Sequence, residues 1–79
     1  MSTLSVLQAI KSAINDAPRN AYIAELHLQI IKHADELQSL TGREFCEGVE
    51  IGPSFGTEFL KMRKIAPRLR MAGLDPSKI

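Results

Sequence analysis

Side chains of the types that support catalysis or bind metals are few and scattered in this sequence. His27 and His33 are six residues apart, which places them well apart around a helix rather than at the i, i+4 spacing of a two-histidine metal site. Cys46 falls in a predicted core, where a thiol is unreactive by default. Ser54 has no evident base near it. We therefore expect no enzyme, no metal site and no cofactor, with one histidine partly buried in a structural role and the other on the surface.

Hydroxyl and ammonium side chains lie on one side of a helix that is predicted over about residues 53–65. At about 100° per residue, one face is apolar and the opposite face carries hydroxyl and ammonium groups. The apolar face consists of Phe55, Phe59, Met62 and Ala66. The polar face consists of Ser54, Thr57, Lys61 and Lys64. A helix that packs by one side and offers such a face can enter a DNA major groove.

A well-marked helix start precedes this element. Thr41 and Glu44 have the spacing of a capping box, in which each side chain bonds the backbone N–H of the other residue. Leu40 and Phe45 flank the cap at the spacing of a hydrophobic staple. Together with the later helix, this predicts a helix-turn-helix over residues 41–65.

The turn between the two predicted helices departs from the usual pattern at Glu50. A helix-turn-helix usually has a glycine there, because the position takes a positive φ, which is uncommon for Glu. Either Gly52 takes the unusual angle instead or the turn is longer than standard. Gly52 followed by Pro53 fits an N-cap and first helical position, and Ser54 is the competing cap.

Charge is distributed unevenly along the chain. Up to Glu58 there are four basic and eight acidic residues, and from Phe59 onward there are six basic residues and one acidic residue. Such asymmetry indicates a nucleic-acid partner when it coincides with a recognition helix. Besides the polar face, the basic residues expected to contact DNA phosphates are Arg43, Arg63, Arg68 and Arg70.

Two amphipathic helices are predicted before residue 41, and a short one after residue 66. The first runs to about Ala17, with Val6 off its main apolar stripe, and the second ends near Gln38. Pro67 is expected to end or kink the recognition helix at Ala66, with Gly73 closing a last short helix. The prediction is one all-α domain over residues 1–79, a compact bundle of four to five helices.

Several stretches resemble the small stand-alone bacterial HTH-like domain proteins. The likeness spans about residues 24–65 and is carried by Leu26-His27-Leu28, by the run from Ile31 to Leu37, and by Ile51-x-x-Ser54-Phe55-x-Thr57-Glu58-Phe59. The resemblance implies a compact helical fold and nucleic-acid binding, and it supplies no catalytic residues. Glu50 and Pro67 depart from the family pattern.

Two functions follow as hypotheses. The first is a transcriptional regulator that binds double-stranded DNA as a homodimer, because one helix-turn-helix this small reads only a half-site. The alternative is a protein-binding module, such as an antitoxin-like partner, adaptor or inhibitor, with an exposed apolar patch around Val6, Leu28, Ile31 or Leu60. With one cysteine, no signal peptide and no apolar run of membrane-spanning length, the expected location is the cytoplasm.

Overall fold

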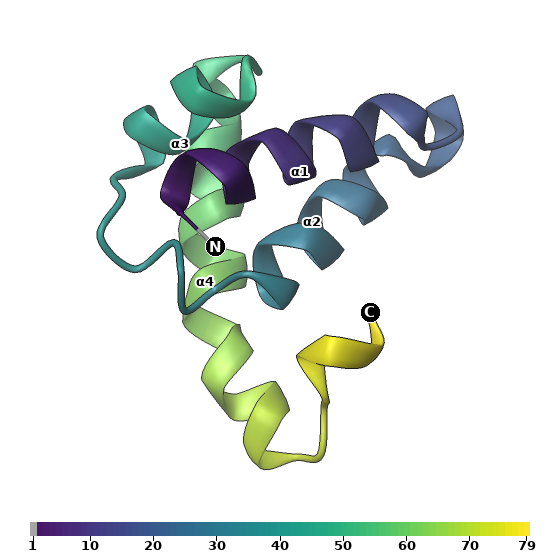
Figure 1. Cartoon of the computed structure of the whole chain (residues 1–79), viewed down its shortest axis with the longest axis vertical. Coiled ribbons are helices and arrows are strands. Elements are labelled where there is room, and N and C mark those ends of the chain that lie inside the picture. Colours follow the sequence, from purple (N-terminus) through teal and green to yellow (C-terminus); the bar gives the residue numbers. More distant parts are fainter. Residues whose placement is uncertain (1) are drawn as a thin grey trace.

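Four α-helices and three short 3-10 helices account for the regular structure of residues 2–79, the residues that the computed structural model describes (Figure 1). The helices are α1 (Thr3–Asp16), α2 (Tyr22–Lys32), α3 (Gly42–Val49) and α4 (Gly56–Met71). The 3-10 helices are η1 (Arg19–Ala21), η2 (Pro53–Phe55) and η3 (Pro76–Lys78). No strand occurs among these residues, which confirms the all-α fold class.

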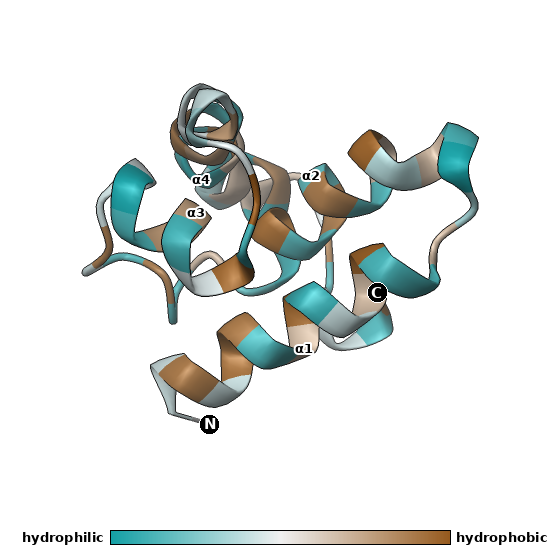
Figure 2. Cartoon of the chain, turned by 90° about the horizontal axis from the view of Figure 1, so that it is seen from above, coloured by the Kyte–Doolittle hydropathy of each residue, from teal (hydrophilic) through white to brown (hydrophobic). Residues whose placement is uncertain are grey.

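The core lies where the four helices meet. Each helix contributes residues from one side, and apolar and polar residues accordingly alternate about once a turn along α1 and α2 (Figure 2). Its largest fully buried side chains are Val6, Ile10, Ile14, Leu26, Ile30, Leu37, Phe45, Cys46, Val49 and Phe59. Val6 is therefore a core residue, and the expectation that it widens an exposed apolar surface is wrong. Leu4, two residues earlier, is instead 66% exposed.

The start of α3 confirms the predicted capping box. The Thr41 hydroxyl accepts the backbone N–H of Glu44 at 3.1 Å, and the Glu44 carboxylate accepts the N–H of Thr41 at 2.9 Å. Phe45 is fully buried and Leu40 packs against the core, as the staple predicts. These local contacts fix where α3 begins and how the chain enters it.

The turn after α3 shows which of its residues takes the positive φ. Glu50 itself takes the left-handed conformation, with φ 64° and ψ 47°, whereas Gly52 is extended, so the alternative that Gly52 takes the positive φ is wrong. The N–H of Ile51 reaches the carbonyl of Cys46 at 3.0 Å, and that of Glu50 reaches Glu47 at 3.3 Å, which is a Schellman motif. The Glu50 carboxylate also pairs with Lys11 of α1.

The second helix is shorter than predicted. α2 ends at Lys32, and residues 33–39 form consecutive turns rather than helix to Gln38. These turns keep Ala34 and Leu37 in the core, at 1% and 0% exposure. At the end of these turns, the carbonyls of Leu37 and Gln38 accept hydrogen bonds from Arg63 of α4. Tertiary packing therefore overrides the helical periodicity of this stretch.

The last helix is longer than predicted. α4 continues through Pro67 to Met71, so the expected end at Ala66 and the separate short helix are both wrong. Ala66 is buried, and Arg70 pairs with Asp35 of the turn segment; these contacts hold the final turns in place although proline removes one helical hydrogen bond. Gly73, at φ 113°, closes the helix with a second Schellman motif, as its sequence position predicts. Residues 74–79 then turn back to contact α2 (Figure 1).

The left-handed backbone at Glu50 gives a stability prediction. Glu50→Ala removes the exposed carboxylate and keeps a side chain at positive φ, whereas Glu50→Gly removes the carboxylate and also relieves the steric cost. Since that cost is roughly 1–2 kcal/mol and glycine loses part of it as chain entropy, Glu50→Gly should be more stable than Glu50→Ala by about 1 kcal/mol. Thermal unfolding followed by circular dichroism measures the difference. Equal melting temperatures would show that residue 50 does not need a positive φ.

Candidate nucleic-acid interface

The first turns of α3 and α4 meet at two glycines. A Cβ on Gly42 would lie 3.1 Å from both the Cα and the carbonyl oxygen of Gly56, so the two backbones approach more closely than a residue with a side chain ordinarily allows. Arg43 and Thr57 follow these glycines directly, which brings both to the same end of the helix pair. This close crossing places the first turns of α3 and α4 directly against each other.

Two aromatic rings lock the same pair of helices together. Phe45 of α3 stacks on Phe59 of α4, with ring centroids 4.3 Å apart and planes at 15°. Both side chains are fully buried. The stack determines which side of α4 faces the protein and, consequently, which side faces solvent.

The side of α4 opposite Phe59 is a basic stripe, which we define as Thr57, Lys61, Lys64 and Arg68. Successive members are four, three and four residues apart, which places all of them on one helical face. Every member is exposed, and the structure records no ion pair between any of the three cations and another residue of 2–79. At 1.5 Å per residue, the helix that carries the stripe is about 24 Å long.

Ser54 and Arg43 lie next to the start of this helix rather than on it. Ser54 is exposed in η2, immediately before α4. Arg43 is the second residue of α3, and its side chain is 86% exposed while pairing with Glu47 at 3.1 Å. Exposed i, i+4 pairs of this type contribute only a few tenths of a kcal/mol, so the Arg43 guanidinium stays available to another anion.

The two remaining predicted residues contact the protein itself. Arg70 pairs with Asp35, which neutralises its charge. Arg63 donates from Nη1 to three backbone carbonyls, those of Leu37 at 2.9 Å, Leu40 at 2.6 Å and Gln38 at 3.4 Å. Its guanidinium also lies 4.7 Å from the centre of the Phe59 ring, a cation–π distance. Arg63 therefore fastens residues 37–40 to α4.

Sequence reasoning missed this fastening role, although a signal for it exists. Arg63 is four residues after Phe59 and therefore lies above it on the buried side of the helix, not on the solvent face. A basic residue at that spacing from a core aromatic indicates packing through its guanidinium plane. Its carbonyl partners could not be foreseen, because they depend on the unpredicted turns at residues 33–39.

The thiol and the two imidazoles considered first are buried or partly buried. Cys46 is 2% exposed, and desolvation by burial raises the pKa of its thiol, which disfavours the nucleophilic thiolate. His33 is 9% exposed, and its pKa is lowered chiefly by desolvation, against an opposing effect of Glu36. His27 Nε2 lies 3.1 Å from the carboxylate of Glu58, without hydrogen-bonding geometry.

Neither a metal site nor a membrane segment is recorded in the described part of the chain. Within residues 2–79, no three His, Cys, Asp or Glu side chains are grouped so that they could hold a metal ion. None of the helices there combines the length and the apolar character needed to cross a membrane.

Comparison with protein families identifies the fold. The family model described as HTH-like domain matches residues 4–72, which include all four helices almost completely. The chain belongs to this HTH-like domain family. Comparisons with curated proteins and with solved structures found no match. The family match confirms the resemblance seen in the sequence and extends it to α1 and to the last turns of α4.

The fastening role of Arg63 gives a second prediction. Arg63→Ala should lower the free energy of unfolding by about 2 kcal/mol, because hydrogen bonds to charged groups each contribute roughly 1.5–3 kcal/mol and the Leu40 carbonyl loses the bond that it accepts from Arg63 at 2.6 Å. The neighbouring exposed variant Lys64→Ala should change stability by no more than about 0.5 kcal/mol. Urea unfolding of the two variants tests this. Similar midpoints would mean that the carbonyl contacts of Arg63 add nothing to stability.

Proposed function

We propose that this protein binds double-stranded DNA by placing α4 in the major groove. The observation that carries the proposal is the basic stripe: three exposed cations without acidic partners in the described residues, on the helix face opposite the core. Membership in the HTH-like domain family supports it, because the second helix of a helix-turn-helix is the one that enters the groove.

The composition of the stripe favours electrostatic binding over strict sequence reading. Lysine and arginine neutralise phosphates, and either can also contact guanine in the major groove. No Asn or Gln accompanies them to make the bidentate contact to adenine. Ser54 and Thr57 offer hydroxyls, which bond to several bases. We therefore propose modest preference between sequences and strong dependence on salt.

The finer proposal is a transcriptional regulator that acts as a homodimer in the bacterial cytoplasm, where the DNA lies. One helix-turn-helix covers a single half-site, and pairing two copies doubles the contact area and sets the spacing between half-sites. Sedimentation of the protein with and without duplex DNA tests the stoichiometry. Two protein chains per short duplex would support the dimer, and one chain at saturation would contradict it.

A protein-binding module is the second candidate, and exposed apolar side chains favour it. Met71 is 89% exposed, and Leu60 (48%), Ile65 (44%) and Leu69 (36%) lie on the flanks of the same helix. On α2, Leu28 is 41% exposed. Apolar surface of this kind can mark a protein contact. An apolar contact would be nearly insensitive to salt, which separates it from binding through phosphates.

The DNA-binding proposal predicts a specific salt dependence. If Arg43, Lys61, Lys64 and Arg68 each neutralise one phosphate, the logarithm of the association constant should fall against the logarithm of salt with a slope of roughly −3.6. Lys61→Ala combined with Lys64→Ala should reduce that slope to about −1.8 and weaken binding about 60-fold at 0.1 M salt. Fluorescence anisotropy with a labelled generic duplex measures both quantities.

A charge-matched control distinguishes a local contact from a change in net charge. Arg19 and Lys78 are exposed cations outside the helix-turn-helix, and replacing both by Ala removes the same two charges. This control should bind DNA with nearly the wild-type slope. If both double variants lose affinity equally, or if the wild-type protein shows no binding at low salt, α4 is not the DNA-binding helix.

A further inference from the structure

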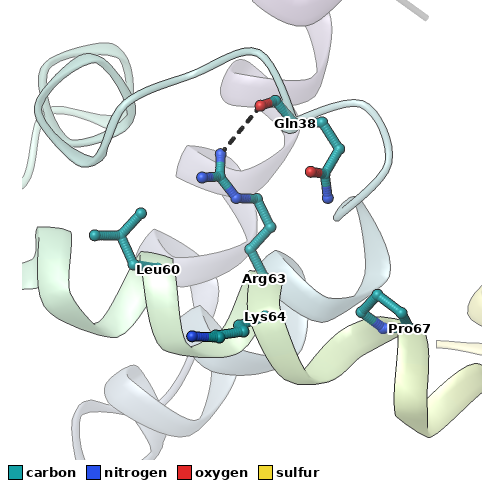
Figure 3. Close-up of a pocket in the computed structure, with 5 residues that line it drawn as sticks. All are labelled: Gln38, Leu60, Arg63, Lys64 and Pro67. Carbon is teal, nitrogen blue, oxygen red and sulfur yellow. Dashed lines mark hydrogen bonds between the residues drawn. The ribbon is translucent and has the colours of Figure 1, made fainter.

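A shallow pocket of about 460 Å³ lies between α4 and the turn segment that precedes α3. Its lining residues are Gln38, Leu60, Arg63, Lys64 and Pro67. Figure 3 shows Arg63 reaching from α4 toward the segment that carries Gln38, with Lys64 and Leu60 next to it on the same helix. Lys64 also belongs to the basic stripe, so the pocket adjoins the surface proposed to face DNA.

Arg63 presents an immobilised guanidinium to this pocket. Its Nη1 is held by backbone carbonyls, at 2.6 Å from Leu40 and 2.9 Å from Leu37, and its Cζ lies over the Phe59 ring. A guanidinium has five N–H donors, two of them on Nη1. Among residues 2–79 no hydrogen bond is recorded from Nε or Nη2. Three donors on a fixed, charged group are thus available to a ligand.

The chemistry of the lining favours an anion. Two cations, Arg63 and Lys64, share the pocket, and no carboxylate lines it. Leu60 and Pro67 provide apolar walls without hydrogen-bonding side chains. A guanidinium whose orientation is already fixed binds a tetrahedral phosphate with two parallel hydrogen bonds and little loss of side-chain entropy.

We propose that this pocket holds one phosphodiester group of the DNA backbone when α4 lies in the major groove. The inference rests on the proposed DNA binding and adds to it a defined position for one phosphate. Contacts to phosphates fix the register of a protein on the duplex without reading bases. Arg63 also binds residues 37–40, which directly precede α3. The position of the bound phosphate is therefore fixed relative to α3 as well as to the basic stripe.

The test leaves Arg63 in place and changes the charge of the pocket. Gln38 is exposed and lines the pocket, so Gln38→Glu adds a negative charge to the lining. The matched control is Gln8→Glu on α1, which is also exposed and makes the same change in net charge. Urea unfolding first confirms that both variants fold, since Gln38→Glu also loses a 3.2 Å bond from the side-chain amide to the Ala34 carbonyl.

Anisotropy titrations then compare the two variants on the same duplex. Excluding one phosphate should reduce the magnitude of the salt slope by about 0.9 and weaken binding about eightfold at 0.1 M salt in Gln38→Glu. Gln8→Glu should keep the wild-type slope. If the two variants bind alike while wild-type protein binds with strong salt dependence, the phosphate site is wrong and the proposed function stands. If wild-type protein does not bind, both fail.

A direct observation of Arg63 completes the test. The Nε–Hε resonance of Arg63, assigned from the spectrum of an Arg63→Lys variant, should shift when duplex DNA is added to the wild-type protein. A shift with duplex supports the site, whether or not inorganic phosphate alone also produces it. An Arg63 resonance that moves with inorganic phosphate but not with bound duplex would overturn the proposal and indicate a site for a small free anion.

Discussion

The stack of Phe45 on Phe59 is the interaction on which the arrangement of α3 and α4 depends. It joins the two helices through fully buried rings, and Arg63 covers the Phe59 ring while binding the carbonyls of residues 37–40. Three segments that are separate in the sequence are thereby fixed to one another. Because Phe59 faces inward, the opposite side of α4 must face solvent, and that is the side on which the basic stripe lies.

The pairing of charged side chains differs between the solvent face of α4 and the rest of the protein. Acidic residues from the first two-thirds of the chain pair with cations outside the basic stripe. Glu50 pairs with Lys11, and Asp35 pairs with Arg70. The basic stripe is left without such partners among the described residues. A net charge of only +1 for the whole chain is therefore compatible with a strongly positive face.

Local sequence signals predicted the features that depend on residues close together in the sequence. The capping box at Thr41 and Glu44 and the closing glycine at Gly73 involve residues a few positions apart, so their spacing alone contains the information. The helical periodicity likewise identified most of the core and the polar face of α4. At the turn, the sequence left the position of the positive φ open between residues, and the structure assigns it to Glu50.

The errors arise where distant segments determine the conformation. α2 ends at Lys32, and the turns that follow it are joined to α4 by hydrogen bonds from Arg63, about 25 residues later in the chain, to the carbonyls of Leu37 and Gln38. The passage of α4 through Pro67 depends on contacts of its final turns with the core and with Asp35. Val6 lies off the stripe drawn through its own helix, and its burial depends on what packs around that helix. The apolar periodicity of a single helix carries no information about its contacts with other segments.

The most direct test of the central claim is a map of chemical-shift changes on the 15N-labelled protein as duplex DNA is added at low salt. If the solvent face of α4 is the DNA surface, the largest changes will be at the amides of Thr57, Lys61, Lys64 and Arg68 and at the start of α3, while the amides of α1 stay almost unchanged. Changes concentrated on α1 and α2, or no changes with excess DNA, would contradict it.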